Sequence, residues 1–393
     1  GLNGLRASYA TSWENSALSH GQLFKKLSTN FVLNYVKPEI KLDHLYKMTT
    51  GIGLIQFSKL NQPDIKSGYT LDDNARALIV ICETYKLRRD SELLNSIKIY
   101  FNFILSCQRD LGTFLNYVDK NEHFTNQNDQ VNLEDSNGRA IWAIGHMIAI
   151  QDLVPTNYEY FFERARESFH EFLPNIPTFH SPRALGFIIK GMKISGLVKP
   201  ETLYYSIFLQ IGSKLAKMYE HESCSNWKWF EPYLTYGNSV LPEAMLEIYK
   251  LTKLVKYKVI AFTSFNFLLQ HFFVDKKFTV ISNQRWFLKG DSTNDCSLGG
   301  QHPIDVAYTI LALKNFDQTF PNEGYKEKME LAFSWFMGNN HLKQIIYNPC
   351  TTGCCDGLEL KNVNLNQGAE STVSYLMARL SFEEFLESKT DIL

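Results

Sequence analysis

Six segments of this chain read as helices that are apolar nearly all round and rich in alanine, and they limit its fold more than any other feature. A helix of this kind must be covered on every side, because it has no face that suits water. In order, the segments are NARALIVICETY, GRAIWAIGHMIAI, RALGFIIKGMKISG, SVLPEAMLEIYKL, PIDVAYTILALKNF and ESTVSYLMARL. The sequence therefore predicts six buried helices inside a covering layer.

Amphipathic segments alternate with the buried ones and supply that layer. They begin at Ser91, Asn157, Glu201, Leu254 and Tyr325, and each has a polar face suited to the surface. The motifs that start the buried segments follow one another at 48 to 65 residues, roughly one helical hairpin per repeat. We predict an all-α fold, the (α/α)6 toroid, with six inner and six outer helices.

The closing element of this ring is expected near the N-terminus. The segment SHGQLFKKLSTNFVLNYV, from Ser19, is the expected outer helix of the last hairpin. Residues 1–40 then form an N-terminal segment, and residues 41–393 form the toroidal domain. A right-handed superhelical array of helical repeats is the competing architecture, and it would expose both end repeats.

Composition narrows the class of protein. A chain of 393 residues with 45% hydrophobic residues can bury a large core. The net charge of -1, with no run of lysine or arginine, argues against nucleic acid or an anionic membrane surface as partner. No window reaches the length of a membrane span. The N-terminus has neither the charged nor the apolar region of a leader, so we expect a cytoplasmic protein. Because the chain begins with Gly1, a periplasmic protein whose leader was removed is the alternative.

The cysteines do not indicate a disulfide framework or a metal site. Their number, seven, is odd, and Cys82 and Cys107 lie within apolar helical patterns. Cys350, Cys354 and Cys355 cluster in NPCTTGCCDG, but the spacing is not that of a paired zinc motif. We predict no metal and no cofactor.

A polar cluster precedes every one of the six buried helices. The clusters are YTLDDN, NLEDSN, FHSPR, FEPYLTYGN, GGQHPID and NLNQGAE. In a toroid these helix starts share one face, so their side chains are expected to converge on a central cavity, where the helix dipoles favour carboxylates. Asp73 and Asp135 can also be read as helix caps. Arg76 and Arg139 can be read as structural ion-pair partners of those acids.

The segment NWKWFEPYLTYGN concentrates aromatic residues in an expected loop. Its rings are Trp227, Trp229, Phe230, Tyr233 and Tyr236. Aromatic rings beside carboxylates suit the apolar faces and hydroxyl edges of sugars. Core packing is the alternative for some of them.

Several motifs, taken in their order along the chain, resemble those of the six-hairpin glycosidase superfamily. They resemble more closely a group of bacterial domains that are often fused behind a glycosyltransferase. The similar stretches, within Tyr69 to Leu380, are DDNARAL, EDSNGRAIWAIG, SPRALGFIIKG, WFEPYLTYGNSVLPEAML, QHPIDVAY, WFMGNN and GCCDGLELKNVNLNQGAEST. One departure is His302, where the group's pattern has a glutamine. The opening SYATSWENSALSHGQLFKKL is also similar to the tail of a retaining GT-B glycosyltransferase, which implies a covalent or functional link to such an enzyme.

The superfamily resemblance implies a glycan-active enzyme, in the first place an inverting glycoside hydrolase acting on an oligo- or polysaccharide. Such an enzyme needs a protonated acid for the leaving oxygen and a carboxylate to activate water. Glu134 or Asp135 is the favoured acid and Asp73 the favoured base. The full set of candidate catalytic acids is Asp73, Glu134, Asp135, Glu231, Asp305 and Glu370. The candidate substrate contacts are Asp72, Arg183, Trp229, Tyr236, Asn238, Gln301 and His302.

Two other function classes stay open. Toroids of this shape also host sugar epimerases and isomerases, which would use histidine, and His180 and His302 stand at helix starts. His146, inside an apolar run, is expected to be a core residue. The other class is a non-catalytic glycan-binding module that serves a transferase. A lyase fits less well, because clustered acids would repel the uronate carboxylates of its substrates.

Overall fold

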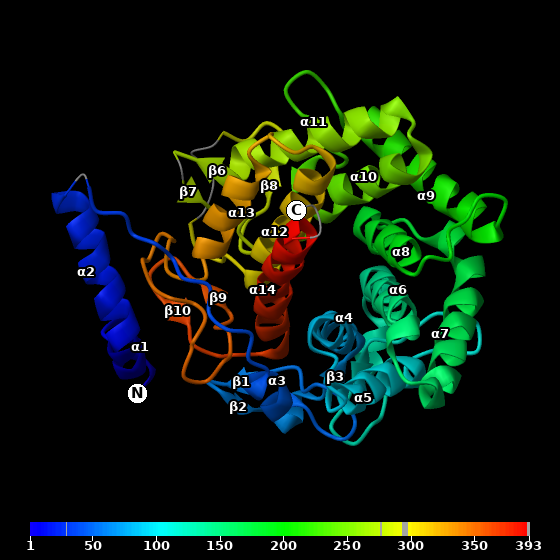
Figure 1. The fold of residues 1–393 in the computed structure, drawn as a ribbon, viewed down its shortest axis with the longest axis horizontal. Helices are drawn as coiled ribbons and strands as arrows, with labels where there is room; N and C mark the ends of the chain where they lie inside the picture. The colour runs from blue at the N-terminus through cyan, green and yellow to red at the C-terminus, as the bar shows by residue number, and fades with distance from the viewer. Residues whose placement is uncertain (29, 276, 293–297, 391–393) are drawn as a thin grey trace.

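The computed structural model describes residues 1–28, 30–275, 277–292 and 298–390, and in this part of the chain six helices surround a common centre (Figure 1). These inner helices are α4 (Leu71–Arg88), α6 (Glu134–Ala149), α8 (Pro182–Ile194), α10 (Val240–Thr252), α12 (Pro303–Thr319) and α14 (Ala369–Thr390). Each packs on the next, and α14 packs on α4. The ring is therefore closed, which confirms the predicted toroid over the open superhelical array.

The five predicted surface helices cover the outside of this ring. They are α5 (Leu93–Ser106) on α4, α7 (Glu159–Phe172) on α6, α9 (Leu203–Glu222) on α8 and α10, α11 (Val255–Phe272) on α10, and α13 (Tyr325–Ser334) on α12. None of the helices in the described residues is apolar over a length that would cross a bilayer.

The inner helices are buried all round because neighbours contact every side of them. In α12, the consecutive positions Ile304, Asp305, Val306, Ala307 and Tyr308 are all buried, although they point in different directions. Complete burial of one aliphatic side chain stabilises the folded chain by about 1.5–3 kcal/mol compared with leaving that side chain exposed. Each outer helix exposes one face to solvent, and that face is polar. The pattern of hydrophobicity along a helix therefore determines whether it is an inner or an outer helix.

The prediction for the sixth outer helix is wrong. The segment from Ser19 is helical only to the end of α2 (Trp13–Leu27), which lies to one side of the ring with α1 (Leu2–Ala10) (Figure 1). In α2, only Asn15 and Leu18 are buried, so this helix has no wide apolar stripe to place against α14.

An extended segment and one short helix take the position instead. The Pro38 carbonyl oxygen accepts a hydrogen bond from Arg379 Nε at 2.6 Å, and Lys37 Nζ lies 4.7 Å from the centre of the Phe382 ring. The short helix α3 (Asp43–Met48) packs on α14. The last inner helix is thus covered mainly by backbone that runs across it.

Short antiparallel strand pairs brace the connecting loops. The pairs in the described residues are β1 (Ser58–Lys59) with β2 (Gln62–Pro63), β3 (Tyr69–Thr70) with β4 (Tyr117–Val118), β5 (Tyr233–Leu234) with β8 (Phe287–Leu288), β6 (Phe273–Val274) with β7 (Lys277–Phe278), and β9 (Gly357–Leu358) with β10 (Val363–Asn364). Strand β3 leads directly into α4, and an isolated bridge joins Gln301 to Leu358. The loops that lead into the inner helices are therefore held by backbone hydrogen bonds.

Two glycines let α6 and α8 approach unusually closely. A Cβ atom added at Gly145 would lie 2.3 Å from the Gly191 carbonyl oxygen, and one added at Gly191 would lie 2.4 Å from the Ile141 carbonyl oxygen. Either atom would collide with backbone, which cannot move aside as a flexible side chain can. This contact therefore requires glycine on both helices.

Gly145→Ala is accordingly expected to lower the free energy of unfolding by at least ~2 kcal/mol, because it overpacks a contact between two backbones. Urea unfolding followed by circular dichroism measures the change. Gly4→Ala in α1 is the matched control, since a Cβ there meets nothing within 4 Å. Equal stability of the two variants would contradict this account of the packing.

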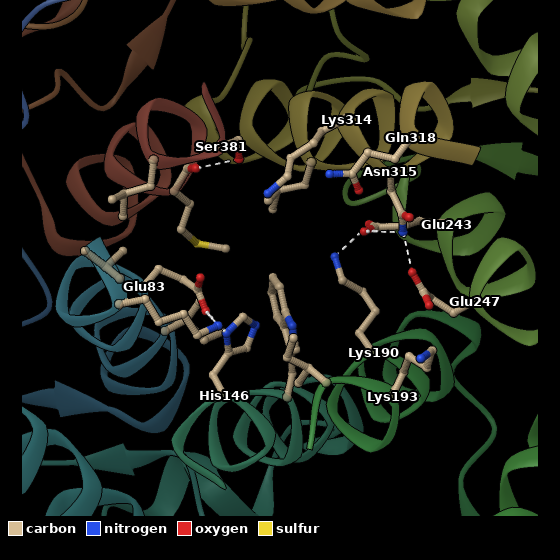
Figure 2. A pocket seen from close by; sticks show the side chains of 18 of the residues that line it. Glu83, His146, Lys190, Lys193, Glu243, Glu247, Lys314, Asn315, Gln318 and Ser381 are labelled. Carbon is tan, nitrogen blue, oxygen red and sulfur yellow. Dashed lines mark hydrogen bonds and ion pairs between the residues drawn. The ribbon is translucent and has the colours of Figure 1, made fainter. Parts of the chain in front are cut away.

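The two ends of the ring differ in character. The downstream parts of the inner helices line a cavity of about 350 Å³ (Figure 2). The upstream ends of the same helices carry the polar clusters that the sequence predicts to be functional, and the candidate site lies there.

Candidate active site

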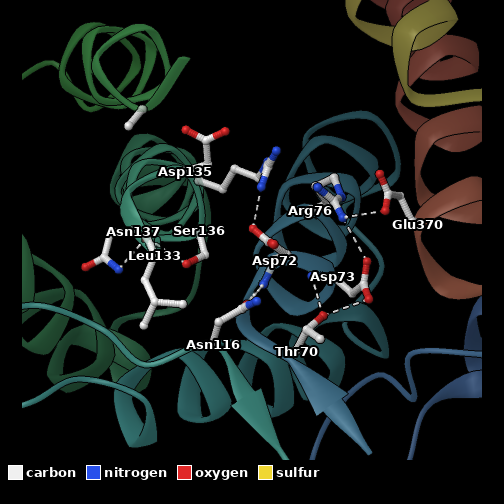
Figure 3. Close-up of polar contacts among 12 residues, drawn as sticks. Thr70, Asp72, Asp73, Arg76, Asn116, Leu133, Asp135, Ser136, Asn137 and Glu370 are labelled. Atoms are coloured by element: carbon white, nitrogen blue, oxygen red, sulfur yellow. Dashed lines mark hydrogen bonds and ion pairs between the residues drawn. The ribbon is translucent and has the colours of Figure 1, made fainter. Parts of the chain in front are cut away.

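The N-terminal ends of the inner helices bring acids and arginines from separate stretches of sequence close together (Figure 3). Asp72 and Asp73 come from α4, Asp135 from α6, and Glu370 from α14. The ring closure between α14 and α4 is what places Glu370 beside residues almost 300 positions earlier in the chain.

Asp73 and Arg76 form a buried ion pair, and the more exposed Glu370 lies beside it. One Asp73 carboxylate oxygen lies 2.8 Å from Arg76, and the other accepts a hydrogen bond from the Thr70 hydroxyl at 2.7 Å. Glu370 lies 3.6 Å from the same Arg76 nitrogen. The residue that caps α4 is Thr70, whose hydroxyl accepts from the Asp73 N–H. The capping interpretation of Asp73 is therefore wrong, and its carboxylate is committed to Arg76.

Asp72 turns the other way and joins α4 to α6. Its carboxylate accepts a hydrogen bond from Arg139 at 2.6 Å. The Arg139 guanidinium also lies over the rings of Phe187 and Tyr236, 4.9 and 5.8 Å from their centres. Arg139 thus pairs with an acid on the neighbouring helix rather than with Asp135 on its own helix, which corrects the expectation from spacing.

Glu134 and Asp135 bind the loop before α8. Glu134 accepts hydrogen bonds from the backbone N–H groups of His180 and Ser181, and Asp135 accepts from the Ser181 hydroxyl. The first turn of α6 has no side-chain cap, so Asp135 does not act as one. Both carboxylates hold neighbouring helix starts in register.

Arg183 organises the next part of the ring. Its guanidinium contacts both carboxylate oxygens of Glu231, at 3.0 and 2.9 Å, which is the geometry of a strong two-point ion pair. It also donates to the Tyr236 carbonyl oxygen at 2.6 Å and lies 3.5 Å from the Asn238 side-chain oxygen. Arg183 therefore fixes the loop before α10 and, with it, the half-buried Tyr236 ring.

Asp305, at the start of α12, accepts a hydrogen bond from the Gly237 N–H at 2.6 Å. It is almost fully buried. Burial raises the pKa of Asp305 to about 7, and the nearby Glu370 charge adds to the increase. Asp305 therefore retains its proton to an unusually high pH.

The pKa values of Asp73 and Glu370 are shifted in opposite directions. Burial raises the pKa of Asp73 to about 6 against the opposing charge of Arg76. Burial also opposes ionisation of Glu370, but the charges of Arg76, His302 and Arg139 hold the pKa of Glu370 below its ordinary value. The Glu370 side chain is 42% exposed, so this ionised carboxylate is open to approach within the ring. The site thus combines one accessible carboxylate with two buried acids that favour the proton.

Several predicted contacts lie within the protein. Trp229 is fully buried and packs against Phe230. For this residue, the alternative of core packing is correct. Gln301 is buried and accepts a hydrogen bond from the Trp335 indole N–H at 2.9 Å. The Asn238 side chain closes its own loop through the backbone of Thr235. These three side chains are therefore part of the protein interior in this structure.

The histidines occupy different settings. His302 caps α12 through its Nδ1 atom, which accepts a hydrogen bond from the Ile304 N–H at 3.3 Å. His180 is exposed. His146 is largely buried, as expected, but it faces the opposite end of the ring, where Nδ1 lies 2.5 Å from Glu83.

Two residues of the site were not identified from the sequence. Tyr308 is buried one turn after Asp305, and the charges of Arg139 and Arg76 act on it. A lone tyrosine in a mostly apolar inner helix was the available signal. Asp356, in the glycine-rich loop, accepts from the Gly368 N–H at 2.8 Å, and burial raises its pKa.

The described residues contain no group of three or more His, Cys, Asp or Glu side chains placed to hold a metal ion. The described cysteines are all free thiols, and Cys354 and Cys355 are buried.

The pKa of Asp305 leads to a test of stability. Because this pKa is higher in the folded chain than in the unfolded chain, the free energy of unfolding falls as the pH rises from about 4 to about 7. Asp305→Asn removes this penalty and keeps an oxygen for the Gly237 N–H. The variant is expected to gain stability, by at most about 4 kcal/mol at pH 8 and by much less at pH 5.

Urea unfolding at the two pH values measures this gain. Asp152→Asn, at an exposed position, controls for the general loss of a carboxylate. A gain that is the same at pH 5 and pH 8 would contradict the raised pKa of Asp305.

Comparison with solved structures identifies the fold. The sequence itself matches no protein-family model and no curated protein. A cellobiose 2-epimerase from Bacillus thermoamylovorans B4167 superposes with a TM-score of 0.66 at 10% identity, covering 95% of this chain and 100% of that one. A D-mannose isomerase gives 0.59 at 11% identity, covering 88% and 96%. An α-mannanase from Bacteroides thetaiotaomicron gives 0.55 at 11% identity, covering 81% and 88%.

These proteins have different activities and share one architecture with this chain. At such low identity the likeness concerns the fold alone. The chain has the six-hairpin glycosidase-like (α/α)6 toroid fold.

Proposed function

We propose that this protein is a carbohydrate-active enzyme, and specifically a glycoside hydrolase, whose active site is the acid cluster at the N-terminal ends of the inner helices. One observation supports this most strongly: Asp305 and Glu370, on adjacent inner helices, have pKa values shifted in opposite directions. Acids whose environments separate their pKa values in this way are suited to act as an acid and base pair.

In this proposal Asp305 is the general acid and Glu370 the general base. Asp305, protonated to about pH 7, donates its proton to the glycosidic oxygen as the bond to the leaving sugar breaks. Glu370 removes a proton from the water that attacks the anomeric carbon from the opposite face. Inverting hydrolysis requires the two carboxyl groups to lie about 6.5–9.5 Å apart, and acids at the starts of adjacent helices can meet that spacing.

This assignment replaces the pair favoured by the sequence. The carboxylates of Glu134 and Asp135 are bound to the loop before α8, and Asp73 is bound to Arg76. We therefore assign positioning roles to these three acids.

The arginines prepare the site for a polar ligand. The Nε atoms of Arg76 and Arg139 are buried and have no hydrogen-bond partner in the described part of the chain. Buried donors are nearly always satisfied, so unsatisfied ones beside Glu370 are suited to substrate oxygens or ordered water. The half-buried Tyr236 ring, which lies against Arg139 and Arg183, offers an apolar surface beside these two arginines.

A sugar epimerase or isomerase is the second candidate. It is favoured by His302, which lies near Glu370 at the start of α12 and would complete a pair of groups for proton abstraction and return. In that case His302→Ala would abolish turnover. In the hydrolase the same change removes a helix cap and leaves measurable activity.

The experiment that tests the proposal is incubation of the protein with a panel of defined oligosaccharides and bacterial polysaccharides, with new reducing ends measured over time. The hydrolase proposal predicts release from at least one glycan. Conversion of a sugar without any new reducing end would favour the epimerase. Binding by calorimetry with no conversion of any glycan would favour a non-catalytic glycan-binding module.

A further inference from the structure

A second group of ionisable side chains lies at the opposite end of the ring from the acid cluster. It lines the cavity of about 350 Å³ to which all six inner helices contribute side chains (Figure 2). Glu83 lies ten residues after Asp73 on α4, which places it roughly 15 Å further along the helix. The cavity is therefore distinct from the proposed active site.

One ion pair within the lining is both short and buried. Lys190 lies 2.6 Å from Glu243, and both side chains are 7% exposed. Lys190 Nζ is also 4.2 Å from the centre of the Trp142 ring. Figure 2 shows Lys190 and Lys314 reaching toward the centre of the ring from different helices. These charges face a shared space rather than bulk solvent.

The lining carries more positive than negative charge. Its five lysines exceed its three glutamates by two. Burial lowers the pKa of His146, so this side chain adds no charge at neutral pH. An excess of lysine in a closed ring favours an anionic ligand, and lysine is a common phosphate binder.

The helix dipoles explain only part of this arrangement. Lys86, Lys193 and Lys250 lie in the last turns of their helices, where a cation stabilises the negative end of the dipole. Lys190 and Lys314 lie further from the helix ends. Dipole compensation also gives no reason for a cavity between them.

The rest of the lining suits a hydroxylated ligand. Glu247 accepts a hydrogen bond from Asn315, and Asn315 and Gln318 face the same cavity. Carboxylate and amide groups bind sugar hydroxyls as donors and acceptors. Ile79 and Leu311 add apolar wall. The volume is at the lower end of the range for small-molecule sites.

We propose that this cavity binds a phosphorylated sugar, with the phosphate held by the lysines and the hydroxyls by the carboxylate and amide side chains. This site is separate from the proposed active site, so each can be right while the other is wrong.

Calorimetric titration with glucose 6-phosphate and mannose 6-phosphate tests the proposal. The double variant Lys193→Gln/Lys314→Gln is expected to weaken binding at least ~tenfold, because it removes two charged donors. Lys217→Gln, on an exposed position of α9, is the matched control and should change the affinity less than twofold. Glu370→Gln should also leave this binding unchanged. Thermal unfolding verifies that the variants fold.

The other probes separate the parts of the proposal. Glucose should bind at least tenfold more weakly than the sugar phosphates. Glucuronate binding as tightly as they do would overturn the preference for phosphate. Inorganic phosphate binding as tightly would overturn the sugar part. No binding of either sugar phosphate, or equal binding by wild type and double variant, would overturn the proposal as a whole.

Discussion

Glu370→Gln is expected to lower kcat by roughly a thousandfold or more on any glycan that the wild-type protein cleaves. Glutamine keeps the size and hydrogen-bonding capacity of the side chain but cannot accept the proton of the attacking water. The carboxylate that it replaces is ionised and accessible, unlike the buried acids around it. Steady-state kinetics with the wild type and the variant measure the loss.

The matched control is Glu327→Gln at an exposed position of α13, which should leave kcat within twofold. Affinity for the substrate should survive in Glu370→Gln, because the arginines and Tyr236 remain. If this variant keeps more than a tenth of the wild-type kcat, Glu370 is not the general base.

The second large effect concerns Asp305 and pH. A general acid whose pKa is about 7 must be protonated to act, so kcat/KM of the free enzyme is expected to fall roughly tenfold per pH unit above about 7. At low pH the rate is expected to hold until Glu370 itself takes up a proton, because the pKa of Glu370 is lowered. Asp305→Asn should reduce kcat/KM by about 10²–10⁴-fold and remove the alkaline limb of the profile.

Substrates with different leaving groups sharpen this test. An aryl glycoside with an acidic phenol needs little protonation, so Asp305→Asn should impair its cleavage far less than that of a natural glycan. Equal impairment of both substrates, or a variant that keeps the alkaline limb near pH 7, would contradict the role of Asp305 as general acid.

Most of the fold is predictable from the sequence because it depends on hydrophobic patterns along single helices. The run PIDVAYTILALKNF is apolar nearly all round, and most of α12 is indeed buried. The exception is the closing element over α14. Its cover is a stretch of backbone around Pro38, which has no helical periodicity to detect.

The position of the candidate site is predictable, whereas its pairings are not. A polar cluster at each helix start is visible in the sequence, and the toroid places those starts on one face. Whether Arg139 pairs with Asp135 on its own helix or with Asp72 on α4 depends on how α4 packs against α6, and that contact is long-range. Likewise, neither the opposite pKa shifts of Asp305 and Glu370 nor the complete burial of Trp229 follows from residue type.

The opposite end of the ring shows the same limit. His146 reads as a core residue, and it is largely buried. Its partner Glu83 and the lysines of the cavity come from separate inner helices and lie away from the polar clusters that precede those helices. Only the assembled ring reveals that they share one space.

The most direct measurement of the central claim is the isotope content of the products when a cleaved glycan is incubated in ¹⁸O-labelled water and, separately, in D₂O. Hydrolysis at the acid cluster predicts one ¹⁸O atom in each newly formed reducing sugar, no deuterium bound to carbon, an inverted anomer by proton NMR, and loss of all of these signals in Glu370→Gln. Deuterium on a sugar carbon without ¹⁸O incorporation would contradict the hydrolase account and establish epimerase or isomerase chemistry instead.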